Sequence, residues 1–337
     1  MKRIILVITM LLGMSLWAGN ASAEIVVSDA LYDDVGAAYT YYSARVYGLN
    51  LIAKKYPSLS AEAIAAKKEF SGDFKPSIDK MDKFVGKYFN TWQKGKKRIS
   101  KIIVEHFSEN RFTPEKARQY INATSRSARD DIKYPILETL LMFKPGYEGN
   151  PEREFIDGYK YKYSSDGSGK AKGMAFSIKA PKTWMEKDAS EPSIQKKFVS
   201  GNGRGDIEFQ ILMQKMLPGK GATKKTISDL LASGEVKHTV PPGSDYIGGG
   251  KLDIENLPGF WTSYAWRLPF EESGVRGTIS MEAIQYSVTY KNYMILMSGF
   301  VMTAINDEKV DLGGVDKHRK LFDLMANSLE IQGVSKK

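Results

Sequence analysis

The side chains that most often carry catalysis or bind metals are few in this chain. It contains no cysteine, and its three histidines, His106, His238 and His318, lie far apart without the spacing of metal ligands. Thiol catalysis and cysteine-rich metal sites are therefore excluded. His106 and His318 fall on the apolar faces of predicted helices, which favours a structural role for both.

The short motifs of nucleotide-binding and hydrolytic enzymes are also absent from the sequence. It has no Gly-x-Ser-x-Gly elbow, no phosphate-binding loop and no Gly-x-Gly-x-x-Gly. We therefore predict no catalytic residue, no cofactor and no metal, and a protein that is not an enzyme. The alternative is a hydrolase whose serine or carboxylate site is assembled from distant residues, because sequence spacing does not reveal such a site.

One candidate binding cluster lies in a predicted strand and consists of Trp261, Tyr264, Trp266 and Arg267. Trp261 and Trp266 differ in parity, so they point to opposite faces if the strand is regular. Two interpretations stay open for the cluster. It packs in a core or between domains, or it lines a groove for a ligand or partner.

A second candidate is the one concentrated basic run of the chain. On a helix, Lys94, Lys97, Arg98 and Lys101 share a face opposite Trp92. Such a face is either simply solvated or a contact for an anionic surface or an acidic partner.

The N-terminus has the pattern of a secretory signal. Lys2 and Arg3 precede the apolar run Ile4–Ala18, and Ala21-Ser22-Ala23 is a small-residue cleavage site. We expect cleavage after Ala23 and a bacterial protein of the periplasm or medium. Without cysteine there is no site for lipid acylation of the new N-terminus.

The net charge narrows the choice of partner. The chain carries a formal charge of +10, and cleavage would remove two basic residues and no acid, leaving +8. Export argues against nucleic acid, so we expect no nucleic-acid partner. An envelope protein is the expected partner, with an anionic membrane surface as the alternative and any small-molecule ligand unidentified.

The first half of the mature chain, residues 24–150, has the periodicity of amphipathic helices. Apolar residues recur every three or four positions from Asp29 to Lys55, and a second helix is predicted at Ala61–Phe70. A third is predicted to begin at Pro76 and run to His106, and Thr113-Pro114-Glu115 begins a fourth. Short connections favour an up-and-down helical bundle. Residues 151–172 are rich in Gly, Ser and charge and are interpreted as a linker that leads into the second domain, with Tyr159–Tyr163 as one possible short strand.

The second half alternates strands with two helices. Its central feature is a hairpin of two apolar strands, Gly277–Tyr290 and Tyr293–Thr303, joined by Lys291-Asn292. The apolar set changes parity near Ala283-Ile284, which predicts a bulge or a change of layer there. A helix follows the hairpin. The fold class is therefore α+β, with an antiparallel sheet between helical layers, an α/β/α sandwich.

This half resembles the PsbP-like domains, a fold shared by PsbP, the Ran-binding Mog proteins and DcrB-type envelope proteins. Phe176, Ile178, Pro181 and Trp184 match the opening Phe-x-Ile-x-x-Pro-x-x-Trp pattern of that family. The order of later segments agrees, ending in His318–Ile331, so residues 173–335 are assigned to the domain. The resemblance implies a non-catalytic binding or assembly module with no common active site, so it transfers no functional residue. Residues 24–150 resemble no family that we recognise.

Overall fold

The structure is a computed structural model that describes residues 28–108, 112–125, 132–147, 149–203, 205–216, 222–272, 275–305 and 314–333. The predicted signal peptide, residues 1–23, lies outside the described residues. The chain divides into two compact units, one of residues Ala23–Gly149 and one that contains Asn150–Lys337. Within the described ranges, none of the helices combines the length and the apolar character that crossing a bilayer requires.

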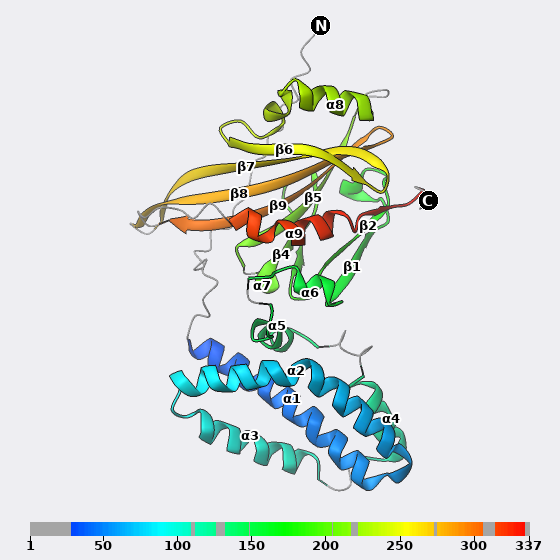
Figure 1. Ribbon diagram of the computed structural model, residues 1–337, viewed down its shortest axis with the longest axis vertical. Helices are drawn as coiled ribbons and strands as arrows, with labels where there is room; N and C mark the ends of the chain where they lie inside the picture. The colour runs from blue at the N-terminus through cyan, green and yellow to red at the C-terminus, as the bar shows by residue number, and fades with distance from the viewer. Residues whose placement is uncertain are drawn as a thin grey trace. The chain divides into compact units, whose positions relative to one another are not determined.

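The first unit is helical (Figure 1). Its described helices are α1 (Asp29–Lys55), the short 3-10 helix η1 (Pro57–Leu59), α2 (Ser60–Tyr88), α3 (Trp92–His106), α4 (Pro114–Asn122) and α5 (Ile136–Met142). Helix α1 packs against each of α2, α3, α4 and α5. The Ser28 hydroxyl accepts a hydrogen bond from the Leu31 N–H at 3.2 Å and so caps α1. The predicted bounds of α1 and the predicted start of α4 are confirmed.

Two helix boundaries differ from the prediction. The predicted break between Phe70 and Pro76 is wrong, because α2 continues through Pro76. Phe70, Phe74 and Ile78 are buried on one side of it, and their packing outweighs the one backbone hydrogen bond that a proline removes. The predicted helix from Pro76 to His106 is instead divided at residues 89–91, where α2 ends and α3 begins.

The second unit is built on antiparallel sheets. Its helical segments are α6 (Arg153–Ile156), η3 (Gly169–Ala171), α7 (Ser200–Gly203), α8 (Lys224–Ala232), η4 (Glu235–Thr239) and α9 (Gly314–Ala326). Its strands are β1 (Lys160–Ser165), β2 (Phe176–Pro181), β3 (Met185–Lys187), β4 (Ile194–Val199), β5 (Ile207–Lys215), β6 (Asp245–Ile254), β7 (Leu257–Glu272), β8 (Val275–Tyr290), β9 (Tyr293–Ile305) and β10 (Glu330–Ile331). Seven strands form the large sheet in the order β3-β4-β5-β9-β8-β7-β6, and β1-β2-β10 form a small one.

The predicted linker at residues 151–172 is ordered as part of this unit. It contains α6, β1 and η3, and β1 pairs along its whole length with β2, from Lys160 opposite Pro181 to Ser165 opposite Phe176. The short strand considered at Tyr159–Tyr163 is present, shifted to Lys160–Ser165. Lys160 and Lys162 alternate with Tyr161 and Tyr163, whose rings lie against the main core.

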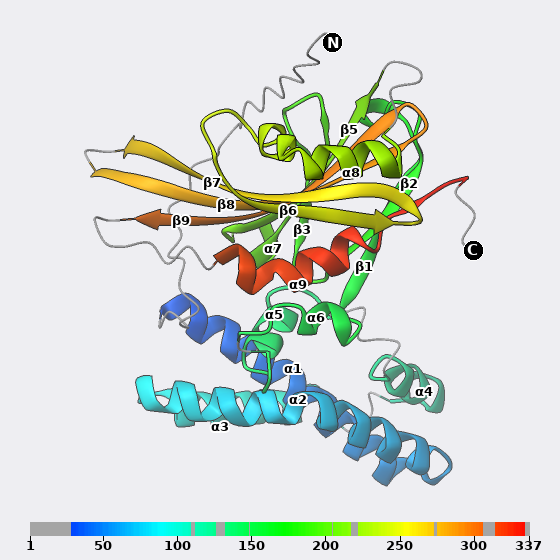
Figure 2. The same ribbon diagram turned by 45° about the horizontal axis from the view of Figure 1, so that its top comes forward.

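The two faces of the large sheet are covered by different helices (Figures 1 and 2). Helix α9 and the small sheet cover one face, where Phe209, Tyr286 and Met297 belong to the main core. Helix α8 and η4 contact β6 and β7 on the opposite face. A carboxylate oxygen of Glu282 on β8 accepts a hydrogen bond from the Val315 N–H at 3.1 Å, which holds the first turn of α9 on the sheet. The predicted α+β class, with an antiparallel sheet between helical layers, is confirmed.

The central hairpin is confirmed. Of the two alternatives predicted for its change of parity, a bulge or a change of layer, the bulge is wrong. β8 pairs with β9 in unbroken register from Thr278 opposite Ile305 to Tyr290 opposite Tyr293. β8 is buried on both faces of the sheet, which we call the α8 face and the α9 face after the helices that cover them. Its apolar residues lie on the α8 face at Met281 and Ala283 and on the α9 face from Ile284 onward, so the alternation of apolar residues changes parity. No backbone irregularity is therefore needed.

Gly299 on β9 is expected to be intolerant of a side chain. A Cβ at this position would lie 2.5 Å from the ring of Phe322, which is fully buried on α9. We expect Gly299→Ala to lower the free energy of unfolding of the sheet unit by about 1–3 kcal/mol, the usual cost of overpacking. Calorimetry of the mature chain would measure it.

Gly36→Ala is the matched control. Gly36 lies within α1 and nothing stands within 4 Å of an added Cβ. The same substitution should stabilise the helical unit by roughly 0.5–1 kcal/mol, because alanine is the better helix former. Equal behaviour of the two variants would contradict the packing of Phe322 against Gly299.

Candidate functional site

Trp261 lies on the α9 face of the sheet, where it contacts the edge strand β6 and the guanidinium of Arg319. Gly250 of β6 stands opposite it, and a Cβ at Gly250 would lie 2.8 Å from the indole nitrogen. On its other side the Arg319 guanidinium lies 4.0 Å from the ring centroid, a close cation–π contact. The indole is thus held between β6 and α9.

A second polar contact continues this arrangement along α9. The Tyr286 hydroxyl donates a hydrogen bond of 2.6 Å to Asp323 Oδ1, one helical turn beyond Arg319. Burial raises the pKa of Tyr286, and the nearby Asp323 carboxylate raises it further. Tyr286 therefore remains a neutral donor, and the contacts of Trp261 and Tyr286 join α9 to β7 and β8.

Tyr264 and Trp266 lie on the opposite face of the same strand. Their ring centroids are 5.2 Å apart in an edge-to-face arrangement, and Tyr264 is fully buried beside Met281, Ala283 and Phe300. Burial raises the pKa of Tyr264, so it too stays neutral. Arg267 is exposed and points to the Trp261 side.

The predicted cluster of Trp261, Tyr264, Trp266 and Arg267 therefore does not form one surface. The parity argument is confirmed, because the two tryptophans occupy opposite faces. β7 pairs with β8 without a break from Gly259 to Glu272 and with β6 from Leu257 to Ala265, so alternation separates Trp261 from Tyr264 and Trp266. A single groove that is lined by all four side chains is excluded by this register.

The basic run behaves differently and forms one exposed face. Lys94, Lys97, Arg98 and Lys101 are all exposed on α3, opposite the buried Trp92. In the described part of the chain, Lys101 alone has an acidic neighbour, Glu105, at 3.8 Å, a pair open to solvent on both sides. We call these four residues the α3 basic face. Ile102 and Val104, each about half exposed, flank it.

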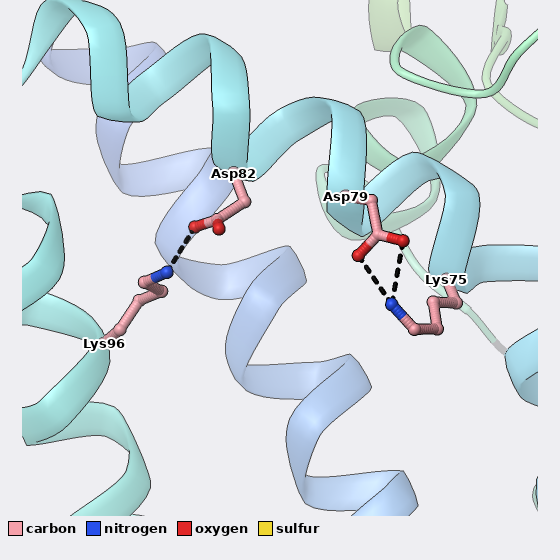
Figure 3. Close-up of polar contacts among 4 residues, drawn as sticks. All are labelled: Lys75, Asp79, Asp82 and Lys96. Carbon is pink, nitrogen blue, oxygen red and sulfur yellow. Dashed lines mark hydrogen bonds and ion pairs between the residues drawn. The ribbon is translucent and has the colours of Figure 1, made fainter.

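Helix α3 is anchored by one carboxylate (Figure 3). Asp82 Oδ1 accepts hydrogen bonds from Trp92 Nε1 and from Lys96 Nζ, each at 2.6 Å. Partial burial of Asp82 raises the pKa of its carboxyl, but the hydrogen bonds from Lys96 and Trp92 lower it by more, so the net shift is downward. The Asp82 carboxylate therefore fixes α3 against α2 with its basic face outward.

A small cavity in the sheet unit does not have the features of an acid–base site. Its volume is about 310 Å³, and Lys162, Ser177 and Glu330 are among its lining residues. Lys162 Nζ lies 2.7 Å from Glu330 Oε2, so the carboxylate of Glu330 is already engaged in an ion pair. Glu138, Glu186 and Asp206 have carboxyl groups with a raised pKa, and none of the three lines this cavity.

The histidines and acids of the described residues form no cluster of three that could hold a metal ion. His318 is largely buried on α9 beside Phe322, at a ring distance of 6.2 Å. Burial, together with the nearby Lys317, lowers its pKa to about 4, so the imidazole is neutral near pH 7. Its position agrees with the structural role predicted from its helix face.

The structure also contains a set of polar side chains that the sequence did not identify. They lie side by side on the α8 face, in one row across four neighbouring strands: Gln210, Ser298, Gln285 and Thr262. All four are at most 2% exposed. The sequence signal was only a polar residue inside each apolar strand, and the strand order was needed to bring them together.

Comparison with known proteins gave similar solved structures only. No family model and no curated protein matches the chain. PsbP from Synechocystis sp. PCC 6803 matches 51% of this chain and 92% of its own, with 15% identity and a TM-score of 0.30. LpqN from Mycobacterium tuberculosis, described as involved in cell envelope biogenesis, matches 52% of this chain and 93% of its own, with 12% identity and a TM-score of 0.31.

A third match is a Pseudomonas aeruginosa protein of unknown function, with 11% identity and a TM-score of 0.24 over 51% of this chain and 96% of its own. The fold class itself rests on the strands and helices described above rather than on these scores.

Asp82→Ala is expected to release α3. The substitution leaves the buried Trp92 N–H and the Lys96 ammonium without their acceptor, at a cost of about 1–3 kcal/mol to the helical unit. Hydrogen exchange in Trp92–His106 should accelerate. Asp79→Ala is the control, since Asp79 pairs with Lys75 in a solvent-exposed ion pair (Figure 3) and should change stability by less than about 0.5 kcal/mol. Equal losses of stability in Asp82→Ala and Asp79→Ala would contradict the role of Asp82 in holding α3 against α2.

The stability of the helical unit should depend on pH through Glu138. Burial raises the pKa of this carboxyl to about 7, and the nearby Asp34 adds to the shift. Because the folded pKa exceeds the unfolded one, the protonated form stabilises the fold. The contribution is complete below about pH 4.5 and is lost as the pH rises through about 7. Glu138→Gln should remove this dependence and raise the melting temperature at pH 8. A melting profile that is identical to wild type from pH 5 to 8 would contradict the shift.

Proposed function

We propose that this chain is an exported, non-catalytic accessory protein of the bacterial envelope that acts by contact with another protein. The observation that carries the proposal is the α3 basic face. Lys94, Lys97 and Arg98 are exposed and have no acidic partner among the described residues, while the helix is fixed from behind by Asp82. A rigid helix with unpaired cations presents a preorganised surface to an acidic partner.

The flanking residues refine the type of partner. Ile102 and Val104 would bury apolar area at the edges of such a contact. Exposed cations mainly accelerate association and make it sensitive to salt, whereas the apolar side chains slow dissociation. The proposed partner is therefore a protein segment that carries acidic side chains together with apolar ones. Export to the periplasm or medium rests on residues 1–23 and is part of the proposal.

The test compares two variants of equal charge in the mature chain from Glu24. One replaces the α3 basic face by glutamate at all four positions. The control replaces four exposed lysines on α1 and α2 by glutamate: Lys54, Lys68, Lys83 and Lys87. Cross-linking and affinity capture from envelope extract, each at two salt concentrations, should give a stoichiometric protein that the first variant loses at least tenfold and the control retains.

Two results would overturn the proposal. Loss of the captured protein in both variants would indicate a non-specific charge effect. Binding of the wild type to anionic vesicles at the same salt, with no captured protein, would indicate a membrane surface as the partner, an alternative that the exposed Ile102 and Val104 also permit.

A further inference from the structure

The small cavity of the sheet unit is large enough to hold a small organic molecule. Its volume of about 310 Å³ lies at the lower end of the range of small-molecule sites, about 300–1,000 Å³. Phe176 and Ile331 belong to its lining, but their side chains are almost fully buried in the main core. The polar side chains of the lining are Lys162, Ser164, Ser177, Glu255, Glu330 and Gln332. This composition favours a hydrophilic ligand.

The strand register of the small sheet places most of these polar side chains on one face. Ser177 of β2 stands opposite Ser164 of β1 and opposite Glu330 of β10. Lys162 lies two residues along β1 from Ser164, so it shares the face of Ser164. Side chains in such a row are direct neighbours across the strands. The polar lining is therefore held by a paired sheet, and the turn between β6 and β7 adds Glu255 to it.

Two of the three charged side chains in the cavity are paired with each other. Lys162 Nζ lies 2.7 Å from Glu330 Oε2, and the Ser177 hydroxyl donates to the same oxygen at 3.3 Å. Glu255, by contrast, has no ion pair among the described residues. One lysine and two glutamates give the lining a formal charge of −1. A ligand with a single positive charge would neutralise it, whereas an anion would be repelled.

The turn that carries Glu255 does not itself require a glutamate. Residues 255–256 connect β6 to β7, with Ile254 opposite Leu257, and φ is +53° at Glu255 and +62° at Asn256. Two-residue hairpin turns with positive φ favour Asn, Asp and Gly, and other residue types are uncommon there. Backbone preference therefore does not account for the carboxylate at position 255, whereas the cavity that it lines gives it a binding role.

We propose that this cavity binds a small hydrophilic monocation that carries one primary ammonium group and several hydroxyl groups. The ammonium donates charge-assisted hydrogen bonds to the carboxylate of Glu255, and the hydroxyls pair with Ser164 and Gln332. The described residues hold no cluster of three acids or histidines, which favours an organic cation over a metal ion. The site lies in the sheet unit and is independent of the α3 basic face, which belongs to the helical unit. Neither the sequence resemblance nor the comparisons assign it.

Three probes of nearly equal size separate the charge requirement from the hydroxyl requirement. 1-Amino-1-deoxysorbitol carries a terminal ammonium, sorbitol has a hydroxyl in its place, and gluconate has a carboxylate. Nuclear magnetic resonance titration of the mature chain should show saturable shifts centred on the lining residues for the amine. Sorbitol and gluconate should bind at least tenfold more weakly. Absence of saturable shifts, shifts centred elsewhere, or equal affinity for sorbitol overturns the proposal.

A matched pair of variants tests the charge of Glu255. Glu255→Gln should weaken binding of 1-amino-1-deoxysorbitol at least tenfold. Glu235→Gln removes the same charge from an exposed position of the same unit outside the cavity, and it should leave the affinity unchanged. Glu255→Asn is a second test, because asparagine suits positive φ and should preserve the melting temperature while binding is lost. Unchanged affinity in both Glu255 variants, or an equal loss in Glu235→Gln, overturns the proposal.

Lys162→Gln distinguishes a cation site from an anion site by the sign of its effect. The substitution removes the partner of Glu330 and changes the formal charge of the lining from −1 to −2. The side chain of Lys162 is half exposed, so loss of the ion pair should cost little stability. We expect 1-amino-1-deoxysorbitol to bind several-fold more tightly to this variant. Weaker binding of the amine would show that Lys162 holds the ligand in place of Glu255, and would overturn the proposal.

Discussion

The close approach of Phe322 to Gly299 is the contact on which the sheet unit depends. The absence of a side chain at Gly299 allows the phenyl ring to lie directly on β9, near the middle of the large sheet. Helix α9 can then lie flat across β8 and β9, with its first turn held by Glu282 and its later turns by Trp261 and Tyr286. The polar contacts fix the direction of the helix, and the phenyl ring fixes its depth.

Burial on both faces follows from this packing and shapes the chemistry of the unit. The central strands are covered by α9 on one side, and on the other side they carry buried polar residues that alternate with apolar ones. Such a strand cannot exchange faces by slipping one residue without burying a different polar set, so the register is strongly specified. The same alternation divides the aromatic residues of β7 between two environments, and a local cluster in sequence becomes two separate sites in space.

Local patterns predicted the parts of the fold that local physics determines. The extent of α1 from Asp29 to Lys55, the Thr-Pro-Glu start of α4 and the apolar strands of the hairpin were all visible in the sequence. Strand β1 was visible only as a possible short strand at Tyr159–Tyr163, because alternating lysine and tyrosine is also compatible with a solvated linker until β2 pairs with it. The continuity of α2 through Pro76 was missed because the packing of Phe70, Phe74 and Ile78 outweighs the helix-breaking signal of a proline. The α3 basic face followed from helical periodicity alone. Arg319 as the neighbour of Trp261, and the polar row, depend on contacts between distant segments.

The glycines of β6 have a consequence for the behaviour of the protein at high concentration. β6 is the last strand of the large sheet, so the outer side of its backbone has no strand partner in the described part of the chain. Gly250 makes room for the indole of Trp261, and Gly248 and Gly250 together leave this edge with little steric shielding. An edge of this kind is a template for self-association. The register shift between Tyr246 and Gly248, together with the charges of Asp245, Lys251 and Asp253, interrupts a flat ladder along it. At this edge, one backbone irregularity and three charged side chains therefore oppose pairing with the same edge of another molecule.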